Sequence, residues 1–177
     1  MVTKTSHEVA DDVAIEISGA PDYVGRGALK LLAALEEWDI DPSGKLALDI
    51  GASTGGFTQV LLERGASRVV AIDVGHGQLH SVLRDDPRVD SFDGTNVRDI
   101  TRDWWQREVG LMPSLIVSDV SFISLTQIIP GVVEVLGGCD WIALIKPQFE
   151  VGKGGVKEGI VTNPELRASA MESVLEC

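Results

Sequence analysis

A glycine-rich turn directly after an apolar run is the feature that most constrains how this chain folds. The run Leu46–Ile50 is followed without a break by Gly51, Ala52, Ser53, Thr54, Gly55 and Gly56. A short apolar run that ends in glycines is typical of a buried strand leading into a helix. Glycine also allows a ligand to approach the backbone closely. The turn therefore predicts a ligand site at the end of a strand in a parallel sheet.

Two aspartates accompany this turn. Asp49 precedes it, and Asp73 ends the next apolar run, residues 69–72. A carboxylate at the end of the second strand is placed to accept hydrogen bonds from the ribose hydroxyls of a nucleoside. The alternative is a tight strand-to-helix turn that binds no ligand. The spacing of the two aspartates favours a site for an adenosine-containing cofactor.

The cofactor is indicated by what the turn lacks. A nicotinamide-binding turn requires glycine where Ser53 stands, and a P-loop requires lysine where Phe57 stands. No Lys or Arg occurs in residues 46–63, so a pyrophosphate would meet only backbone amides. S-adenosylmethionine carries an ammonium, a sulfonium and a ribose but no phosphate. We expect Asp49 and the backbone of residues 51–56 to hold its methionine end, and Asp73 its ribose.

Composition describes an ordinary soluble domain. The 177 residues are 44% hydrophobic and 24% charged, which suits one domain with a sizeable core. No apolar run approaches the roughly 18 residues of a membrane span, and residues 1–6 lack the apolar core of a signal peptide. Cys139 and Cys177 give no disulfide framework. We therefore expect a cytoplasmic protein with no membrane partner.

The charge balance bears on nucleic-acid binding. A net charge of −12 argues against it when taken alone, because phosphate contacts supply most non-specific affinity. The distribution of the basic residues modifies that argument. Five of them fall in segments that end predicted strands or begin predicted helices, namely Arg26, Lys30, Lys146, Lys153 and Lys157. The alternative is that these are scattered solvated charges.

Apolar runs alternate with amphipathic stretches over most of the chain. Strands are predicted at Leu46–Ile50, Arg68–Asp73, Val89–Phe92, Ser114–Asp119 and Trp141–Ile145. Helices are predicted at Gly27–Trp38, Gly56–Arg64, Gln78–Arg84, Thr101–Val109 and Leu125–Leu136, with a further helix start at Asn163-Pro164-Glu165. Alternation of this kind predicts a parallel sheet covered on both faces. We expect an α/β fold with a doubly wound, mostly parallel sheet, as in the Rossmann-like core of S-adenosylmethionine-dependent methyltransferases.

Further polar residues follow the later predicted strands. Asn96, Asp119 and Lys146 stand after the third, fourth and fifth strands, and Lys30 lies on the first predicted helix. Each could be a loop-cap residue, but ligands bind at the carboxyl ends of such strands. Methyl transfer to a hydroxyl requires the oxygen to be held in line with the donor and its proton to be removed. Lys30, Asp119 and Lys146 fit that requirement as catalytic residues, and we expect Asn96 at the adenine edge.

These segments resemble the TlyA family, whose members carry the name hemolysin but are similar to FtsJ-like ribosomal-RNA ribose 2′-O-methyltransferases. The resemblance covers most of residues 23–172 and is carried by Tyr23–Leu31, Asp49–Thr58, Asp73–Leu79, Thr95–Arg98, Ser118–Leu125 and Lys146–Lys153. It implies S-adenosylmethionine as cofactor and ribosomal RNA or ribosomal subunits as partner. It also implies a Lys–Asp–Lys–Glu tetrad, of which Lys30, Asp119 and Lys146 match the first three members.

The resemblance also implies a domain organisation. Residues 1–20, including an alternating segment at 13–17, look like a remnant of the family's N-terminal RNA-binding domain and a linker. Residues 21–177 look like the methyltransferase domain without its last strands. The tetrad glutamate has no counterpart, and Glu150 belongs to a different motif. We therefore expect this chain to bind the cofactor but to methylate RNA poorly or not at all.

The sequence also leaves two alternative functions to consider and contains two weaker signals. A membrane-active hemolysin would need a spanning segment or a basic amphipathic helix. A small-molecule methyltransferase would need neither basic surface nor an RNA-binding appendage. His76 and His80 could share a helical face, but too few further ligands accompany them, so we expect no metal site. The pair Trp104-Trp105 is interpreted as a helix packing on the sheet and not as a base-stacking platform.

Overall fold

Five parallel strands form the centre of the molecule. The computed structural model describes residues 23–152, 155–156 and 159–177. Within this part the strands are β1 (Leu46–Ile50), β2 (Arg68–Asp73), β3 (Val89–Asp93), β4 (Leu115–Ser118) and β5 (Asp140–Ala143). Their order is β3-β2-β1-β4-β5, and each neighbouring pair is parallel. The predicted doubly wound α/β sheet is thereby confirmed, while the segment predicted at 13–17 lies outside the described residues.

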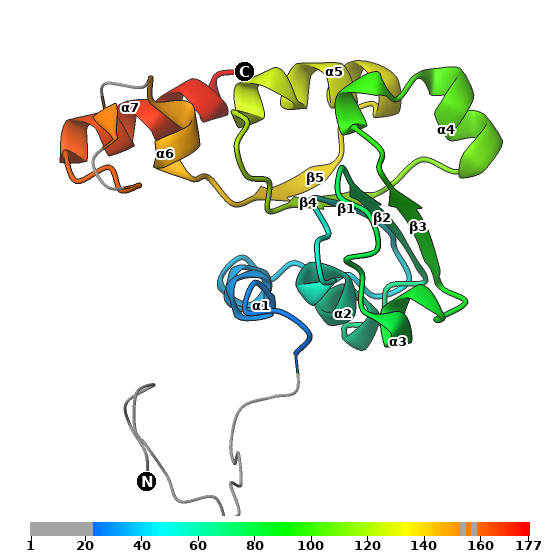
Figure 1. Cartoon of the computed structure of the whole chain (residues 1–177). Helices are drawn as coiled ribbons and strands as arrows, with labels where there is room; N and C mark the ends of the chain where they lie inside the picture. Colours follow the sequence, from blue (N-terminus) through cyan, green and yellow to red (C-terminus); the bar gives the residue numbers. More distant parts are fainter. Residues whose placement is uncertain (1–22, 153–154, 157–158) are drawn as a thin grey trace, which may run out of the picture.

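Helices cover both faces of the sheet. They are α1 (Ala28–Glu37), α2 (Gly56–Glu63), α3 (Ser81–Arg84), α4 (Arg102–Glu108), α5 (Ile129–Leu136), α6 (Pro147–Glu150) and α7 (Pro164–Leu175), with 3-10 turns η1 (Val97–Asp99) and η2 (Leu125–Gln127). Helices α1, α2 and α3 lie on one face, and α4 and α5 lie on the other (Figure 1). Helices α6 and α7 lie next to each other beyond the edge strand β5 (Figure 1).

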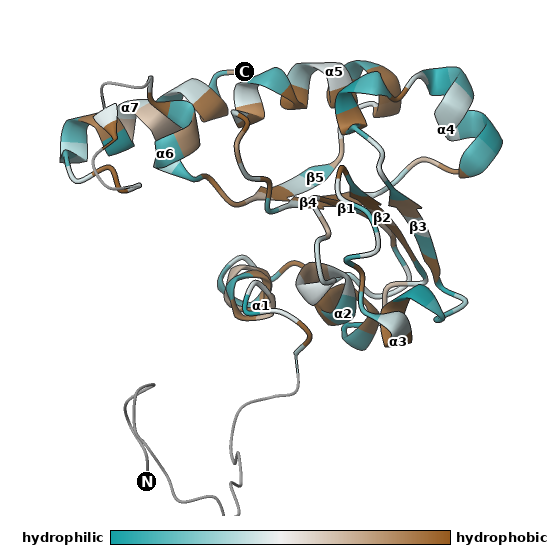
Figure 2. Ribbon diagram, in the orientation of Figure 1, coloured by the Kyte–Doolittle hydropathy of each residue, from teal (hydrophilic) through white to brown (hydrophobic). Residues whose placement is uncertain are grey.

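The central strands β1, β2 and β4 are mostly apolar because alternate residues pack into two separate cores. Ala47 and Val69 belong to the core beneath α1 and α2, whereas their neighbours Leu48 and Val70 belong to the core beneath α4 and α5. In Figure 2 the parts of α5 that face the sheet are brown, which marks them as apolar. Burial on both faces is what parallel sheets require, and it explains why the strand predictions from apolar runs were accurate.

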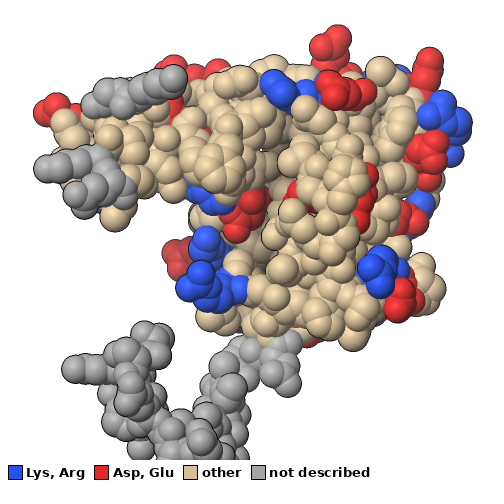
Figure 3. All heavy atoms as spheres, in the orientation of Figure 1, with Lys and Arg blue, Asp and Glu red and all other residues tan. Residues whose placement is uncertain are grey.

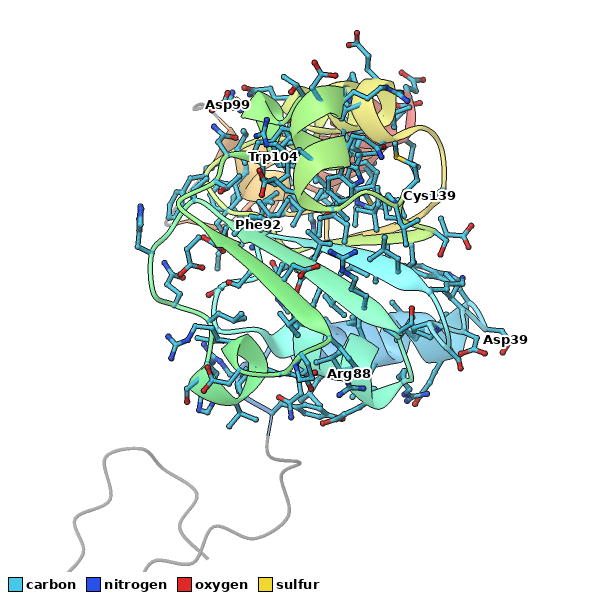
Figure 4. The ribbon with its side chains drawn as sticks, turned by 90° about the vertical axis from the view of Figure 1, so that its right-hand side faces the viewer. Asp39, Arg88, Phe92, Asp99, Trp104 and Cys139 are labelled. Atoms are coloured by element: carbon cyan, nitrogen blue, oxygen red, sulfur yellow. The ribbon has the colours of Figure 1, made fainter. Side chains whose placement is uncertain are left out.

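The tryptophan pair packs on the sheet as predicted. Trp105 of α4 is completely buried in the second core and donates its indole N–H to the Leu111 carbonyl at 2.9 Å. Trp104 lies against Phe92 of β3, edge to face, with ring centroids 4.9 Å apart (Figure 4). These contacts anchor α4 over the outer strands and leave neither ring in a ligand site.

Two helix predictions differ from the structure in detail, and one short helix was not predicted. The helix predicted at Leu125–Leu136 is divided into η2 and α5, because Pro130 has no N–H with which to continue the helical hydrogen bonds of the preceding turn. The helix predicted from Gln78 begins only at Ser81, after His80 caps it by accepting from Val82 N. The short helix α6 after Lys146 was not predicted, since four residues are too few for a periodic pattern.

The strand order fixes where a ligand can sit. The chain moves outward from β1 through β2 to β3 and then returns to place β4 on the other side of β1. The carboxyl ends of β1 and β4 are therefore neighbours whose following loops leave in opposite directions. Crevices of this kind bind ligands in open α/β sheets. The glycine turn follows β1 and Asp119 follows β4, so both lie at this crevice.

Candidate active site

The glycine turn between β1 and α2 requires glycine at two positions. Gly51 has φ +82° and Gly55 has φ +98°, both in the left-handed region. A Cβ on Gly51 would lie 3.1 Å from the backbone oxygen of Asp119, and one on Gly55 would overlap the Leu83 side chain. The turn is thus pressed against the β4 loop on one side and α3 on the other. This close packing fixes its backbone amides at the carboxyl end of β1.

Gly55→Ala is expected to lower the free energy of unfolding by about 2–4 kcal/mol, because it combines a left-handed backbone with overpacking. Urea denaturation measures the change. Gly131→Ala is the matched control, since Gly131 lies in α5 and a Cβ there meets no atom within 4 Å. The control is expected to be neutral or stabilising by up to about 1 kcal/mol. Equal stability of Gly55→Ala and the wild type would contradict the packing described.

Asp49 lies beneath the turn and not in the ligand crevice. It is completely buried, and its Oδ2 accepts a hydrogen bond of 2.7 Å from the Thr58 hydroxyl of α2. Its Oδ1 has no hydrogen-bond partner among the described residues. Burial raises the pKa of the Asp49 carboxyl to about 7. Asp49 lines neither cavity described below, so its contact with a cofactor ammonium stays a prediction.

The raised pKa predicts a pH-dependent stability. The folded state holds the Asp49 proton more tightly than the unfolded state. The protonated carboxyl therefore contributes its full share to the free energy of unfolding below pH 4, and this share is lost as the pH rises to about 7. Relative to Asp49→Asn, the wild type is expected to lose roughly 4 kcal/mol over this window, at about 1.4 kcal/mol per pKa unit. Urea denaturation of both proteins at pH 4 to 8 measures the difference. Parallel stability curves would show that Asp49 ionises normally.

Asp73 ends β2 at the rim of the turn. Its Oδ2 accepts from the Ser53 amide at 2.8 Å, and its Oδ1 accepts from the Gly75 amide at 2.7 Å. The carboxylate thereby connects the β1 turn to the β2 loop. Asp73 lines a cavity of about 520 Å³ together with Val74, Gln78, Asn96, Phe122 and Ile123. We call this space the donor cavity.

Asn96 has a second role besides lining the donor cavity. Its side-chain oxygen accepts from the Arg98 amide at 3.1 Å and caps η1. Asn96 can therefore cap η1 and line the donor cavity at the same time, so the two interpretations of this residue are compatible.

A second cavity lies on the α1 side of the same turn. It encloses about 590 Å³ and is lined by Arg26, Lys30, Phe57, Asp119 and Lys146, among others. We call it the acceptor cavity. Four residues line both cavities, which are therefore contiguous: Gly51, Ser53, Asp119 and Ser121. In Figure 3, blue atoms gather around a hollow on the left of the molecule, between α1 and α6.

The three predicted catalytic residues meet where the cavities join. Asp119 Oδ1 lies 2.6 Å from Lys146 Nζ, and its Oδ2 lies 3.8 Å from Lys30 Nζ. The Lys146 side chain is 19% exposed, whereas that of Lys30 is 52% exposed. Lys146 is thus the sheltered amine, held directly by the carboxylate, and Lys30 is a solvated cation on the opposite side. Because β4 and β5 are adjacent and parallel, residues following both strands come together here.

Sequence reasoning missed three residues of this site. Ser121 accepts a hydrogen bond of 2.7 Å from Lys146 Nζ. Phe122 is 91% exposed with φ +65°, and its ring lies 5.2 Å from that of Phe149, centroid to centroid. Their presence in the motif segments Ser118–Leu125 and Lys146–Lys153 was the available signal, but no spacing rule assigns them a contact.

The donor cavity and its rim fit S-adenosylmethionine. The glycine turn leaves backbone room, a carboxylate stands at the end of β2, and one buried carboxylate oxygen beneath the turn lacks a partner. The turn has no basic side chain that would bind a pyrophosphate.

Among the described residues, no group of three metal-binding side chains comes together. None of the helices in the described ranges has the length and apolar character of a bilayer span.

Comparison with known proteins identifies the family. Residues 23–177 match the family model described as FtsJ-like methyltransferase. This chain belongs to the FtsJ-like methyltransferase family. The match begins at the first described residue and includes every element of both cavities. It confirms the family resemblance inferred from the motif segments.

Individual FtsJ-like relatives agree with this assignment. The chain is 44% identical to Hemolysin A of Brachyspira hyodysenteriae over 99% of its own length and 75% of that protein. It is 46% identical to the 16S/23S rRNA (cytidine-2′-O)-methyltransferase TlyA of Mycobacterium tuberculosis, over 97% of the chain and 64% of that protein. A solved structure of a candidate hemolysin from Streptococcus thermophilus superposes with a TM-score of 0.84 at 40% identity, covering 90% of this chain and 57% of the other.

Proposed function

We propose that this chain is the catalytic core of an S-adenosylmethionine-dependent methyltransferase that modifies ribose 2′-hydroxyls of ribosomal RNA. The observation that carries the proposal is the Lys30–Asp119–Lys146 cluster at the junction of two cavities. One cavity has the features of a nucleoside site, and the other is lined by cations. The name of the Mycobacterium relative, which gives a cytidine-2′-O-methyltransferase of 16S and 23S rRNA, supports the substrate class.

The donor cavity would hold the cofactor. When bound, S-adenosylmethionine supplies a methyl group on a positively charged sulfur. Asp73 would accept hydrogen bonds from the ribose hydroxyls, in the manner of a charge-assisted pair. Asn96 would lie at the adenine edge, and the amides of the glycine turn would receive the carboxylate of the methionine end. Asp49 would stabilise the ammonium from beneath the turn.

Lys146 would act on the acceptor hydroxyl. A ribose 2′-hydroxyl is a weak nucleophile, and removal of its proton during transfer is the contribution expected of a positioned base. Asp119 fixes the Lys146 amine at 2.6 Å, so that it faces the space between the cavities. Lys30, held by the other oxygen of Asp119, would stabilise negative charge that develops on the acceptor oxygen.

The rim of the acceptor cavity would receive the RNA backbone. Arg26 and Lys30 are exposed there, within a protein whose net charge is −12. So few cations neutralise few phosphates, so we expect this chain alone to have weak electrostatic affinity for RNA. We include in the proposal that residues 21–177 form the methyltransferase domain, that residues 1–20 belong to an RNA-binding part and linker, and that the protein acts on ribosomal RNA or ribosomal subunits in the cytoplasm.

Transfer of tritiated methyl groups to ribosomal RNA tests the proposal. The chain is compared with a version that includes whatever residues flank it in the natural protein, called here the extended protein. We expect the extended protein to label ribosomal RNA and the 177-residue chain to label it less. We also expect the chain to bind S-adenosylmethionine, but neither NAD nor ATP, in isothermal titrations. Absence of label with the extended protein would overturn the proposed function.

A further inference from the structure

The amine of Lys146 has two oxygen neighbours and not one. Besides the ion pair with Asp119 at 2.6 Å, Nζ donates a hydrogen bond of 2.7 Å to the Ser121 hydroxyl. A lysine side chain has four rotatable carbon–carbon bonds, so a single anchor leaves its nitrogen able to pivot. A second hydrogen-bond partner in a different direction fixes the position of the nitrogen. It also fixes the direction in which the nitrogen can contact a further ligand. Lys146 therefore has a defined orientation before any ligand arrives.

The loop that carries Ser121 is itself firmly held. Ser121 follows Asp119 by two residues, so both anchors come from the carboxyl end of β4. The next residue, Phe122, adopts a left-handed backbone with φ +65°. The loop then ends at Ser124, whose hydroxyl donates to Glu150 Oε2 at 2.5 Å, while the Leu125 amide donates to Glu150 Oε1 at 3.0 Å. Glu150 belongs to α6, which begins directly after Lys146, so these bonds connect the Ser121 loop to the Lys146 segment.

We propose that Ser121 is a positioning residue that orients the Lys146 amine toward the acceptor hydroxyl. The inference rests on the proposed function and adds a residue to its machinery. Ser121 lines both cavities, which places its hydroxyl beside the path between donor and acceptor. Its hydroxyl contacts the amine that reacts, and it need not contact the substrate itself.

The chemistry requires this orientation. Lys146 can accept a proton only after it has released the one it carries in the ion pair with Asp119. The resulting neutral amine has two N–H groups and one lone pair. When its two N–H groups donate to Asp119 and Ser121, the lone pair of the nitrogen is left to accept the proton of the acceptor hydroxyl. During transfer the acceptor O–H bond breaks and an N–H bond forms at Lys146. The electron pair released on oxygen forms the bond to the methyl carbon, and the pair of the broken carbon–sulfur bond stays on sulfur. Positive charge thus passes from sulfur to Lys146, where both anchors stabilise it.

The orientation can be measured without turnover. Nitrogen-15 relaxation of the lysine side-chain amino groups reports how freely each Nζ moves, and the Lys146 signal is assigned from its loss in Lys146→Arg. In the 177-residue chain we expect a restricted Lys146 amine and greater mobility in Ser121→Ala. Ser121→Thr keeps the hydroxyl, and its extra methyl group is accommodated because Ser121 is exposed. It is expected to restore the restriction. Equal mobility in all three proteins would overturn the proposal.

Turnover supplies the second readout, in the extended protein. Ser121→Ala is expected to lower kcat about tenfold, the scale of a modest misplacement of a catalytic group, with KM for RNA and the affinity for S-adenosylmethionine within about twofold. Ser121→Thr is expected to recover most of kcat. Ser67→Ala is the matched control, since the Ser67 hydroxyl donates to the backbone carbonyls of Gly44 and Lys45, just before β1 and at the end of the sheet opposite the site.

The possible results separate this inference from the proposed function. A loss expressed in KM, an unchanged kcat, or a failure of Ser121→Thr to recover activity would overturn the role of Ser121. If the wild-type extended protein transferred no methyl group at all, the proposed function would fail. The relaxation measurement would still decide whether Ser121 orients Lys146.

Discussion

Lys146→Ala in the extended protein is expected to reduce methyl transfer about 10³-fold, within the range that positioned acid–base groups contribute. Lys146 is the most sheltered amine of the site and is held by Asp119 at 2.6 Å at the junction of the cavities. Its removal takes away the group that receives the acceptor proton. Affinity for S-adenosylmethionine is expected to change little, because Lys146 does not line the donor cavity. Single-turnover kinetics and isothermal titration measure the two effects separately.

Lys45→Ala is the control for this variant. Lys45 forms an exposed ion pair with Asp140 at 3.5 Å, before β1 and at the end of the sheet away from the site. Removing it deletes the same charge without touching either cavity, so transfer is expected to stay within about twofold of wild type, as for most surface pairs. Undiminished turnover of Lys146→Ala would contradict the role of Lys146.

Asp73→Ala is expected to weaken S-adenosylmethionine binding by about 1.5–3 kcal/mol, the contribution of hydrogen bonds to a charged group. This corresponds to a roughly 10- to 150-fold higher dissociation constant. The carboxylate is removed from the donor cavity, and the Ser53 and Gly75 amides lose their acceptor. Asp73→Asn keeps one acceptor oxygen and is expected to lie between Asp73→Ala and wild type. Isothermal titration at fixed pH measures all three affinities.

Asp41→Ala provides the matched loss of a carboxylate. Asp41 accepts only from the Ser43 amide, in the turn before β1 and away from both cavities. The affinity of Asp41→Ala for S-adenosylmethionine is expected to equal that of the wild type. Wild-type affinity in Asp73→Ala as well would mean that the cofactor is not bound at the end of β2.

The strands and the assembly of the site could be predicted from the sequence for a physical reason. Burial on both faces makes β1 and β2 predominantly apolar, and their predicted bounds agree with the structure. Parallel strands bring their carboxyl ends to one edge, so Asp119 and Lys146 were expected together before any distance was known. The position of a residue at a strand end gives only its approximate location, however. It indicates which edge a residue occupies and not which atom it contacts.

Individual side-chain contacts and short helices could not be predicted, because they depend on the exact path of the backbone. Asp49 was expected to hold the methionine end of the cofactor, and this role stays a prediction; that its side chain is buried beneath the turn and accepts a hydrogen bond from Thr58 was not foreseen. In a strand, one position decides which face a side chain occupies, and a buried carboxylate beneath a glycine turn gives no local signal. Ser121 was missed for the same reason, because its bond to Lys146 depends on the path of the loop after β4. Short elements such as α6 carry no periodicity.

Identification of the methylated atom tests the central claim most directly. Ribosomal RNA treated with the extended protein and labelled S-adenosylmethionine is digested to nucleosides, and the labelled nucleoside is analysed by mass spectrometry. Our account predicts that the label resides on the ribose as a 2′-O-methylnucleoside and that Lys146→Ala removes it. Label on a base, or label that persists in Lys146→Ala, would contradict the account.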